Sequence, residues 1–243
     1  MRHGCDIPAT GPGRARPSVG RMNRTRRLLT AATLLLAVSL GAAGCAADGA
    51  LGPAAAAAER KVLYLTFDDG PGDETVEILD LLREHDAKAV FFALGQNLAR
   101  HTDLGRRIVA EGHALANHTW GHADLTGLDD DDRAQQLDPT AALLRRLGSE
   151  SPCVRPPYGA TDDVLAAQLD ARGEQQVLWT VDPADWSRPG ARAVAARLLD
   201  APSGAVVLLH DGGGDRTQTV DALREALPRL AARGYTFDVV PGC

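Results

Sequence analysis

Two histidines stand four residues apart in the segment 118–122 (HTWGH). If this segment forms a helical turn, His118 and His122 share one face and can bind one cation. The alternative is a pair of surface histidines at a loop and a helix start. Because the chain has seven histidines, the spacing alone does not decide between these interpretations.

Two adjacent carboxylates, Asp68 and Asp69, follow an apolar run and precede Gly70 and Pro71, which predicts a constrained turn. An Asx turn that caps the next helix explains one carboxylate but not both, because paired carboxylates repel unless a cation or a shared proton relieves them. Two imidazoles and one carboxylate make the open three-ligand arrangement of a hydrolytic metal site. The second carboxylate then remains available as a base.

The elements that must position these residues alternate along the chain from residue 61 onward, which predicts repeated β-α units with parallel strands. The predicted strands are 61–67, 89–94, 112–117, 153–155, 176–181, 205–209 and 235–240. The clearest predicted helices are 73–85, with Asp73 as its cap, 131–147, 162–172, 192–199 and 218–233. We therefore expect one α/β domain with a closed parallel sheet.

Polar residues follow five of the predicted strands at their carboxyl ends. They are Asp68 with Asp69, His118, Arg155, Asp182 and His210. In a closed parallel sheet these ends converge on one rim, so residues far apart in the sequence meet there. Each residue taken singly has an ordinary structural explanation, such as a surface ion pair or a turn. Their occurrence at five strand ends favours a single site.

Five segments resemble, in order, the motifs of the polysaccharide deacetylases, which are carbohydrate esterase family four and share the NodB homology domain. They are 66–71 (TFDDGP), 118–122 (HTWGH), 155–159 (RPPYG), 182–186 (DPADW) and 208–210 (LLH). The resemblance extends over residues 61–240. It implies a distorted (β/α) barrel of about seven parallel strands and a metal-dependent hydrolase.

The resemblance also implies a role for each matched residue. Asp69, His118 and His122 would bind the metal. Asp68 would be the general base, which takes a proton from the attacking water, and His210 would be the general acid, which protonates the departing amine.

Five further roles follow from the same resemblance. Arg155 would orient and charge-stabilise the base, and Asp182 would pair with the acid and raise its pKa. The backbone N–H of Tyr158 would bind the developing oxyanion. Trp186 and Leu208 would wall the pocket for the acetyl methyl group.

The His-His-Asp ligand set favours Zn²⁺, with Co²⁺, Ni²⁺ or Mn²⁺ as alternatives. The expected substrate is N-acetylglucosamine in a cell-wall or chitin-like polysaccharide. Two alternatives stay open. An O-acetyl esterase such as an acetyl xylan esterase would use the same site, and a metal- or glycan-binding lipoprotein would lack turnover. Asp68 and His210 argue against the binding protein, since neither is needed to hold a metal.

The N-terminal segment has the features of an export signal. Residues before Met22 are rich in Gly, Pro and Arg, consistent with a true start at Met22. Three Arg, the apolar run 28–40 and a group of small residues then lead to Cys45. The run is shorter than the roughly 18 residues that span a bilayer. Small residues before Cys45 resemble the lipobox of bacterial lipoproteins and predict a lipid anchor.

The chain is thus expected to have three parts. Residues 1–44 are an extension and signal peptide, residues 45–58 are an Ala/Gly/Pro tether, and residues 59–243 are the catalytic domain. Cleavage within residues 54–58, which would release a soluble exported enzyme, is the alternative to the lipid anchor.

Four cysteines are present without any CxxC pair. With Cys5 ahead of the mature chain and Cys45 committed to lipid, Cys153 and Cys243 remain as an even pair in an oxidising compartment. We therefore predict a disulfide between Cys153 and Cys243.

The charge distribution bears on the partners. The stretch before Cys45 carries seven Arg and one Asp, so the remainder stands at about −12 against −6 for the whole chain. Such a surface repels phosphate backbones and anionic headgroups, which argues against nucleic acid as a partner. We expect a neutral glycan substrate, membrane contact only through the lipid anchor, and a monomer.

Overall fold

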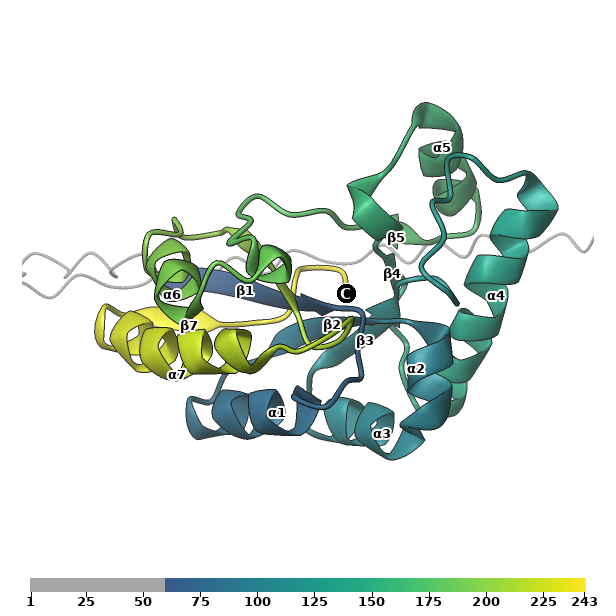
Figure 1. The fold of residues 1–243 in the computed structure, drawn as a ribbon. Coiled ribbons are helices and arrows are strands. Elements are labelled where there is room, and N and C mark those ends of the chain that lie inside the picture. Colours follow the sequence, from purple (N-terminus) through teal and green to yellow (C-terminus); the bar gives the residue numbers. More distant parts are fainter. Residues whose placement is uncertain (1–59) are drawn as a thin grey trace, which may run out of the picture. The chain divides into compact units, whose positions relative to one another are not determined.

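The computed structural model describes residues 60–243, which form a sheet surrounded by helices (Figure 1). The predicted signal peptide (residues 1–44), the tether (residues 45–58) and the predicted lipidation site Cys45 lie outside the described residues and stay predictions. None of the helices within residues 60–243 is both long and apolar enough to cross a membrane.

Seven strands make up the sheet, as the sequence predicts. They are β1 (Lys61–Asp68), β2 (Ala89–Ala93), β3 (Ala114–Asn117), β4 (Cys153–Val154), β5 (Gln175–Gln176), β6 (Val206–His210) and β7 (Tyr235–Phe237). Their order is β5-β4-β3-β2-β1-β6, and β7 pairs with the first three residues of β1. All these pairings are parallel. The α/β class and the barrel-like parallel sheet, which curves into a half-barrel, are therefore confirmed.

Strand β1 shows how the sheet separates two apolar layers. Leu65 and Phe67 are fully buried in a cluster that includes apolar residues of the surrounding helices. Tyr64 packs instead against the cluster that contains Phe92. Because successive side chains of a strand point to opposite faces, Asp68 shares the face of Tyr64, inside the curve of the sheet.

The predicted strand 176–181 is a strand only at its start. β5 ends at Gln176, and the chain then leaves β4 and crosses to β6. There, Thr180 N and Val181 N both donate to Val206 O, at 2.9 and 3.1 Å. The crossing segment thus joins the two outer strands of the sheet.

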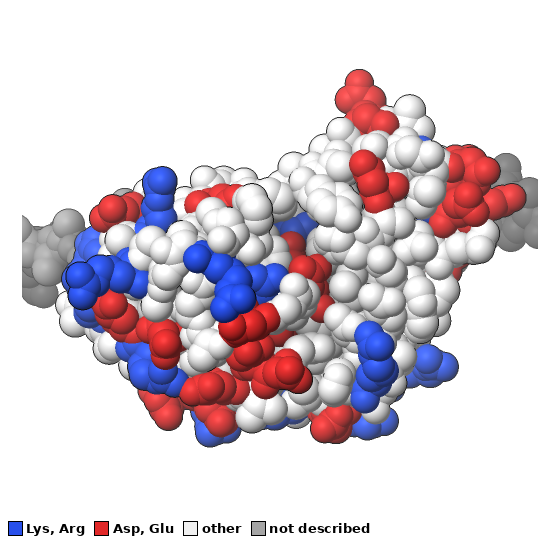
Figure 2. All heavy atoms as spheres, viewed as in Figure 1, with Lys and Arg blue, Asp and Glu red and all other residues white. Residues whose placement is uncertain are grey.

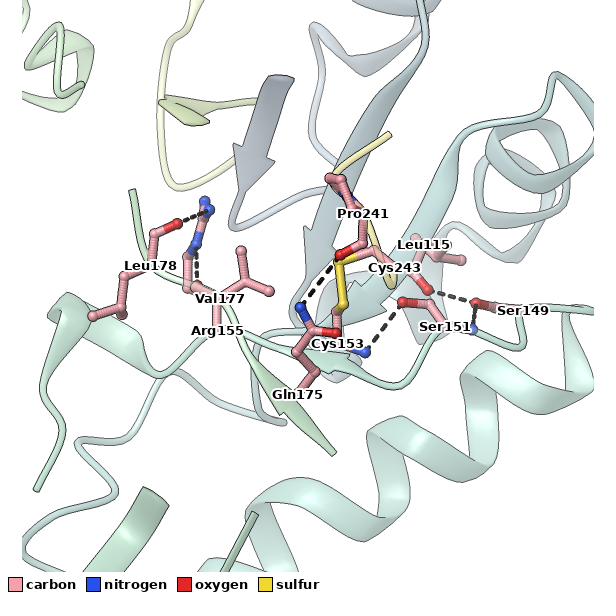
Figure 3. Close-up of a disulfide and its surroundings, with 10 residues drawn as sticks. All are labelled: Leu115, Ser149, Ser151, Cys153, Arg155, Gln175, Val177, Leu178, Pro241 and Cys243. Carbon is pink, nitrogen blue, oxygen red and sulfur yellow. Dashed lines mark hydrogen bonds between the residues drawn. A yellow bond between two sulfur atoms is a disulfide. The ribbon is translucent and has the colours of Figure 1, made fainter. Parts of the chain in front are cut away.

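Arg155 binds the backbone in the middle of this crossing (Figure 3). Its Nε donates to Val177 O at 3.0 Å, and its Nη2 donates to Leu178 O at 3.1 Å. Buried carbonyls need such partners, which a neighbouring strand would normally supply. The Arg155 side chain therefore makes hydrogen bonds that a neighbouring β-strand would otherwise make, and the predicted strand is interrupted here.

Helices cover the sheet, with α6 and α7 towards one side and α4 and α5 towards the other (Figure 1). They are α1 (Thr75–Glu84), α2 (Gly95–Arg100), α3 (Thr102–Ala110), α4 (Asp130–Arg146), α5 (Asp163–Ala171), α6 (Ala191–Leu199), α7 (Thr217–Ala232) and the 3-10 turns η1 (Pro157–Gly159) and η2 (Asp185–Ser187). Asp129 and Asp162 cap α4 and α5 through backbone N–H groups. The predicted cap Asp73 is wrong, because the N-cap of α1 is Glu74 and no side chain caps this helix.

The predicted disulfide between Cys153 and Cys243 is present, with Cα atoms 5.3 Å apart (Figure 3). Cys153 is the first residue of β4, so the bond lies towards the amino ends of the strands. Beside it, Gln175 Nε2 donates to Pro241 O at 3.4 Å. The C-terminal segment is thus attached to the starts of β4 and β5.

Replacing Cys243 by serine should lower the free energy of unfolding by about 2–5 kcal/mol, because the disulfide closes a loop of about 90 residues in the unfolded chain. Urea unfolding of the wild type and of Cys243→Ser, both without reductant, measures this difference. Wild type with reductant should behave like the variant. Equal midpoints for all three samples would contradict the prediction.

Candidate active site

The carboxyl ends of several strands bring the predicted polar residues together. Asp68 ends β1 in register with His210, which ends β6. His118 follows β3, and Arg155 follows the neighbouring β4. Since neighbouring strands lie about 5 Å apart, these side chains meet at one rim. Figure 2 shows acidic side chains in the hollow at the middle of this face.

Three possible metal ligands come together at the rim. The ligand atoms of Asp69, His118 and His122 all lie within 4.8 Å of one another. Oδ1 of Asp69 is 3.6 Å from Nε2 of His118 and 3.4 Å from Nε2 of His122. The structure therefore places the three predicted ligands around one point.

The two histidines come together although their segment is not a helical turn, which is the condition that the sequence argument sets for a shared face. Thr119 and His122 have φ angles of 70° and 65°, which makes the segment a tight loop. Asn117 Oδ1 accepts from Thr119 N at 2.9 Å, and Thr119 Oγ1 accepts from His122 N at 3.0 Å. Side-chain hydrogen bonds to the backbone, rather than a helical ladder, bring the two imidazoles together.

The protonation of these imidazoles suits metal binding. Nδ1 of His118 lies 2.6 Å from the carbonyl oxygen of Arg155. Because a carbonyl only accepts, Nδ1 carries a proton and is engaged with the backbone, so Nε2 is the ring atom that faces Asp69. Burial lowers the pKa of His122, and this effect is larger than the opposing effect of the Asp69 charge. The ring is therefore neutral at neutral pH.

Asp69 has an unsatisfied oxygen at this point. Its Oδ1 is buried without a hydrogen-bond partner, although such atoms are normally paired. One carboxylate and two imidazoles with this geometry fit a divalent cation such as zinc. Behind Asp69, a Cβ at Gly213 would lie 2.6 Å from Oδ2, so glycine is required there.

Asp68 is held apart from this cluster by Arg155. Nη1 of Arg155 donates to Asp68 Oδ1 at 2.8 Å and to Thr66 Oγ1 at 2.7 Å. The Arg155 and Asp68 side chains are 0% and 5% exposed. The second oxygen of Asp68 lies 3.7 Å from His118 Nε2. A buried, hydrogen-bonded charge pair thus fixes Asp68 beside the cluster of Asp69, His118 and His122.

His210 pairs with Asp185 and not with Asp182, so the predicted partner is wrong. Nδ1 of His210 lies 2.7 Å from Asp185 Oδ1, and Asp185 Oδ2 accepts from His210 N at 2.9 Å and from Thr219 Oγ1 at 2.8 Å. Asp182 is exposed and accepts from Ala184 N at 2.7 Å. This Asx turn uses Asp182 locally, and the left-handed Ala184 (φ 57°) leads the chain on to the buried Asp185.

The pKa of His210 is raised above its ordinary value. Burial opposes the charged imidazole, but the hydrogen bond and the charge of Asp185 outweigh burial, together with the charges of Asp68 and Asp69. His210 therefore keeps its proton to a higher pH than an ordinary histidine.

Sequence reasoning misses Asp185 because the strand-end position points to Asp182. The segment 182–186 offers both carboxylates, and only the turn selects between them. Sequence reasoning also misses the buried Asp211, although its position directly after His210 indicates that it lies near the site. Its buried carboxyl group accepts from Thr75 Oγ1 at 2.6 Å, and burial raises its pKa to about 7.

The other predicted site residues surround these groups. Tyr158 has a φ of 62°, and its exposed ring packs edge-on against His122 with centroids 4.5 Å apart. Leu208 is buried two residues before His210 and therefore shares its face of β6. Trp186 is exposed beside the buried Asp185. The accessible ring of Tyr158 thus borders the site.

Comparisons with known proteins agree with this geometry. The sequence model for polysaccharide deacetylases matches residues 55–177. A peptidoglycan-N-acetylglucosamine deacetylase of Bacillus cereus is 38% identical over 74% of this chain and 87% of its own length, and a chitooligosaccharide deacetylase of Rhizobium leguminosarum bv. trifolii is 41% identical over 76% and 93%. The structure of peptidoglycan deacetylase PdaC from Bacillus subtilis superposes with a TM-score of 0.70 at 33% identity, covering 75% of this chain and 89% of that one. The chain therefore belongs to the polysaccharide deacetylase family and is a hydrolase.

Proposed function

We propose that this protein is a metal-dependent N-deacetylase that removes acetyl groups from N-acetylglucosamine units of a cell-wall or chitin-like polysaccharide. The observation that carries the proposal is the register of Asp68 with His210 on adjacent strands, each with its own buried partner. A base and an acid are thereby held separately beside one group of metal ligands. The named activities of the relatives support the same substrate class.

Asp69, His118 and His122 would hold the metal. The His-His-Asp set favours zinc, and cobalt, nickel or manganese fit similar ligands. When bound, the cation supplies Lewis acidity, which polarises the acetyl carbonyl and lowers the pKa of water.

The acid-base steps fall to residues outside the metal-ligand set. Asp68, oriented by Arg155, takes the proton from the water that attacks the acetyl carbonyl carbon. His210 donates a proton from Nε2 to the amide nitrogen as its bond to the acetyl carbon breaks, which releases acetate and a free amine. Asp185 holds the Nδ1 side of the same ring, so Nε2 is the atom left to face the substrate.

Two further groups complete the proposed site. The backbone N–H of Tyr158, set by its left-handed conformation, would donate to the oxygen of the tetrahedral intermediate. Trp186 and Leu208 would enclose the acetyl methyl group. The expected monomeric state and the expected lack of a nucleic-acid partner stay predictions.

Asp68→Asn should lower acetate release by about 100-fold or more while the metal is retained, because the base is lost but the ligands are not. Acetate is measured with N-acetylglucosamine oligomers, peptidoglycan and acetylated xylan. Asp182→Asn is the matched control and should remain near wild type, since Asp182 serves an exposed turn.

The substrate panel also decides between the alternatives. Release from xylan alone would move the assignment to an O-acetyl esterase. Tight glycan binding without release from any substrate would favour a binding protein. An unchanged rate for Asp68→Asn would refute the assigned base.

His118→Ala should reduce the bound metal from about one equivalent to a small fraction, because one of three protein ligands is removed. Elemental analysis after dialysis against metal-free buffer gives the stoichiometry. His85→Ala, at the end of α1, should keep its metal. Full metal content in His118→Ala would place the metal elsewhere.

We also propose export and a lipid anchor at Cys45, on the support of the apolar run and the small residues before it. Cells fed a clickable palmitate should label the wild-type protein and not Cys45→Ser. Absence of label from the wild type would end the lipoprotein proposal and leave release after cleavage within residues 54–58.

A further inference from the structure

We propose that Trp179 is a positioning residue that couples the general base to the oxyanion donor, an inference that rests on the proposed function. Its indole contacts both the Arg155 guanidinium and the turn that carries Tyr158. Neither the metal-ligand set nor the acid-base pairs include it.

The first contact concerns the partner of the base. The Arg155 guanidinium lies over two aromatic rings, with Cζ 4.2 Å from the Phe92 centroid and 5.6 Å from the Trp179 centroid. Aromatic rings attract this cation and restrict it to a plane. Because the same guanidinium donates to Asp68, the position of the indole bears on the direction in which Asp68 points.

The second contact concerns the oxyanion turn. Tyr158 and Gly159 both adopt left-handed conformations, with φ angles of 62° and 65°. A Cβ built on Gly159 would lie 2.7, 3.3 and 3.4 Å from three atoms of the Trp179 six-membered ring. The ring therefore packs directly on the Gly159 Cα, and glycine is the one residue that allows this approach. The indole thus sets how far the Tyr158 turn extends over the site.

The backbone on both sides of Trp179 is fixed, so its ring is a defined reference point. Leu178 O accepts from Arg155, and Thr180 N donates to Val206 O of β6. Trp179 therefore connects the closure of the sheet to both catalytic features. Core packing without any catalytic consequence is the competing interpretation.

The first test compares Trp179→Leu, which removes the ring, with Trp179→Phe, which keeps one. Trp179→Leu should lower kcat about 10- to 100-fold with KM changed by less than about threefold, since small misplacements of catalytic groups act on the transition state. Trp179→Phe should recover most of this loss. Both variants should keep wild-type metal content, because no ligand is touched.

The second test is a double-mutant cycle with a matched control. Gly159→Ala should lower kcat, whereas Gly173→Ala, at a similar φ of 70° with no atom within 4 Å, should not. In the Trp179→Leu background the further loss from Gly159→Ala should be much smaller, because the clash with the indole is gone. Equal losses in both backgrounds, or a Trp179→Leu variant with wild-type kcat, would overturn the proposal.

Hydrogen exchange separates this inference from the proposed function. Gly159 N donates to Pro156 O at 3.1 Å, so its amide reports on the turn. Trp179→Leu should accelerate its exchange about tenfold or more, and Trp179→Phe should not. An active wild type with unchanged exchange and unchanged kcat in Trp179→Leu refutes the coupling alone. A wild type inactive on every substrate refutes the proposed function, and unchanged exchange in Trp179→Leu would then refute the positioning role as well.

Discussion

The burial of one guanidinium is the constraint on which much of this structure depends. The Arg155 side chain is fully buried, and a charge in such a place is tolerated only when its donors are paired. Its partners come from two separate parts of the fold: Thr66 and Asp68 of β1, and the carbonyls of Val177 and Leu178 in the crossing segment. The hydrogen bonds of this one side chain therefore both attach the crossing segment to the sheet and orient Asp68. A lysine could not make the same contacts, because its ammonium group lacks the planar set of donors that the guanidinium presents.

The site also shows how one fold keeps chemically identical rings in different states. His118 donates Nδ1–H to a carbonyl and turns Nε2 towards Asp69, whereas His210 faces a buried carboxylate that favours its charged form. Burial alone dominates at His122 and favours the neutral ring. Burial and the nearest hydrogen-bond partner, rather than the residue type, decide which imidazole suits metal binding and which suits proton donation.

The sequence predicts most of the fold because parallel strands buried on both faces are continuous apolar runs, as in the fully buried β2. It predicts which residues reach the rim because strand ends converge there. What it does not predict depends on backbone conformations without a sequence signature. Thr119 and Ala184 adopt positive φ angles, which no pattern at these positions indicates. For that reason the sequence indicates neither the loop that brings the two histidines together nor the pairing of His210 with Asp185 in place of the predicted Asp182.

The position of the two ends of the described chain has a consequence for how this protein can be combined with others. Lys61 begins β1 some 23 Å, at about 3.3 Å per residue, from Asp68 at the rim, and the disulfide holds Cys243 beside the start of β4. Both points of attachment thus lie at the amino ends of the strands, opposite the rim formed by the carboxyl ends. The rim would stay open to a long polymer if a fusion partner, an immobilising support or an additional module were joined at either of these points. Because the attachment points and the candidate active site lie at opposite ends of the strands, a module can be added without altering the residues of the site.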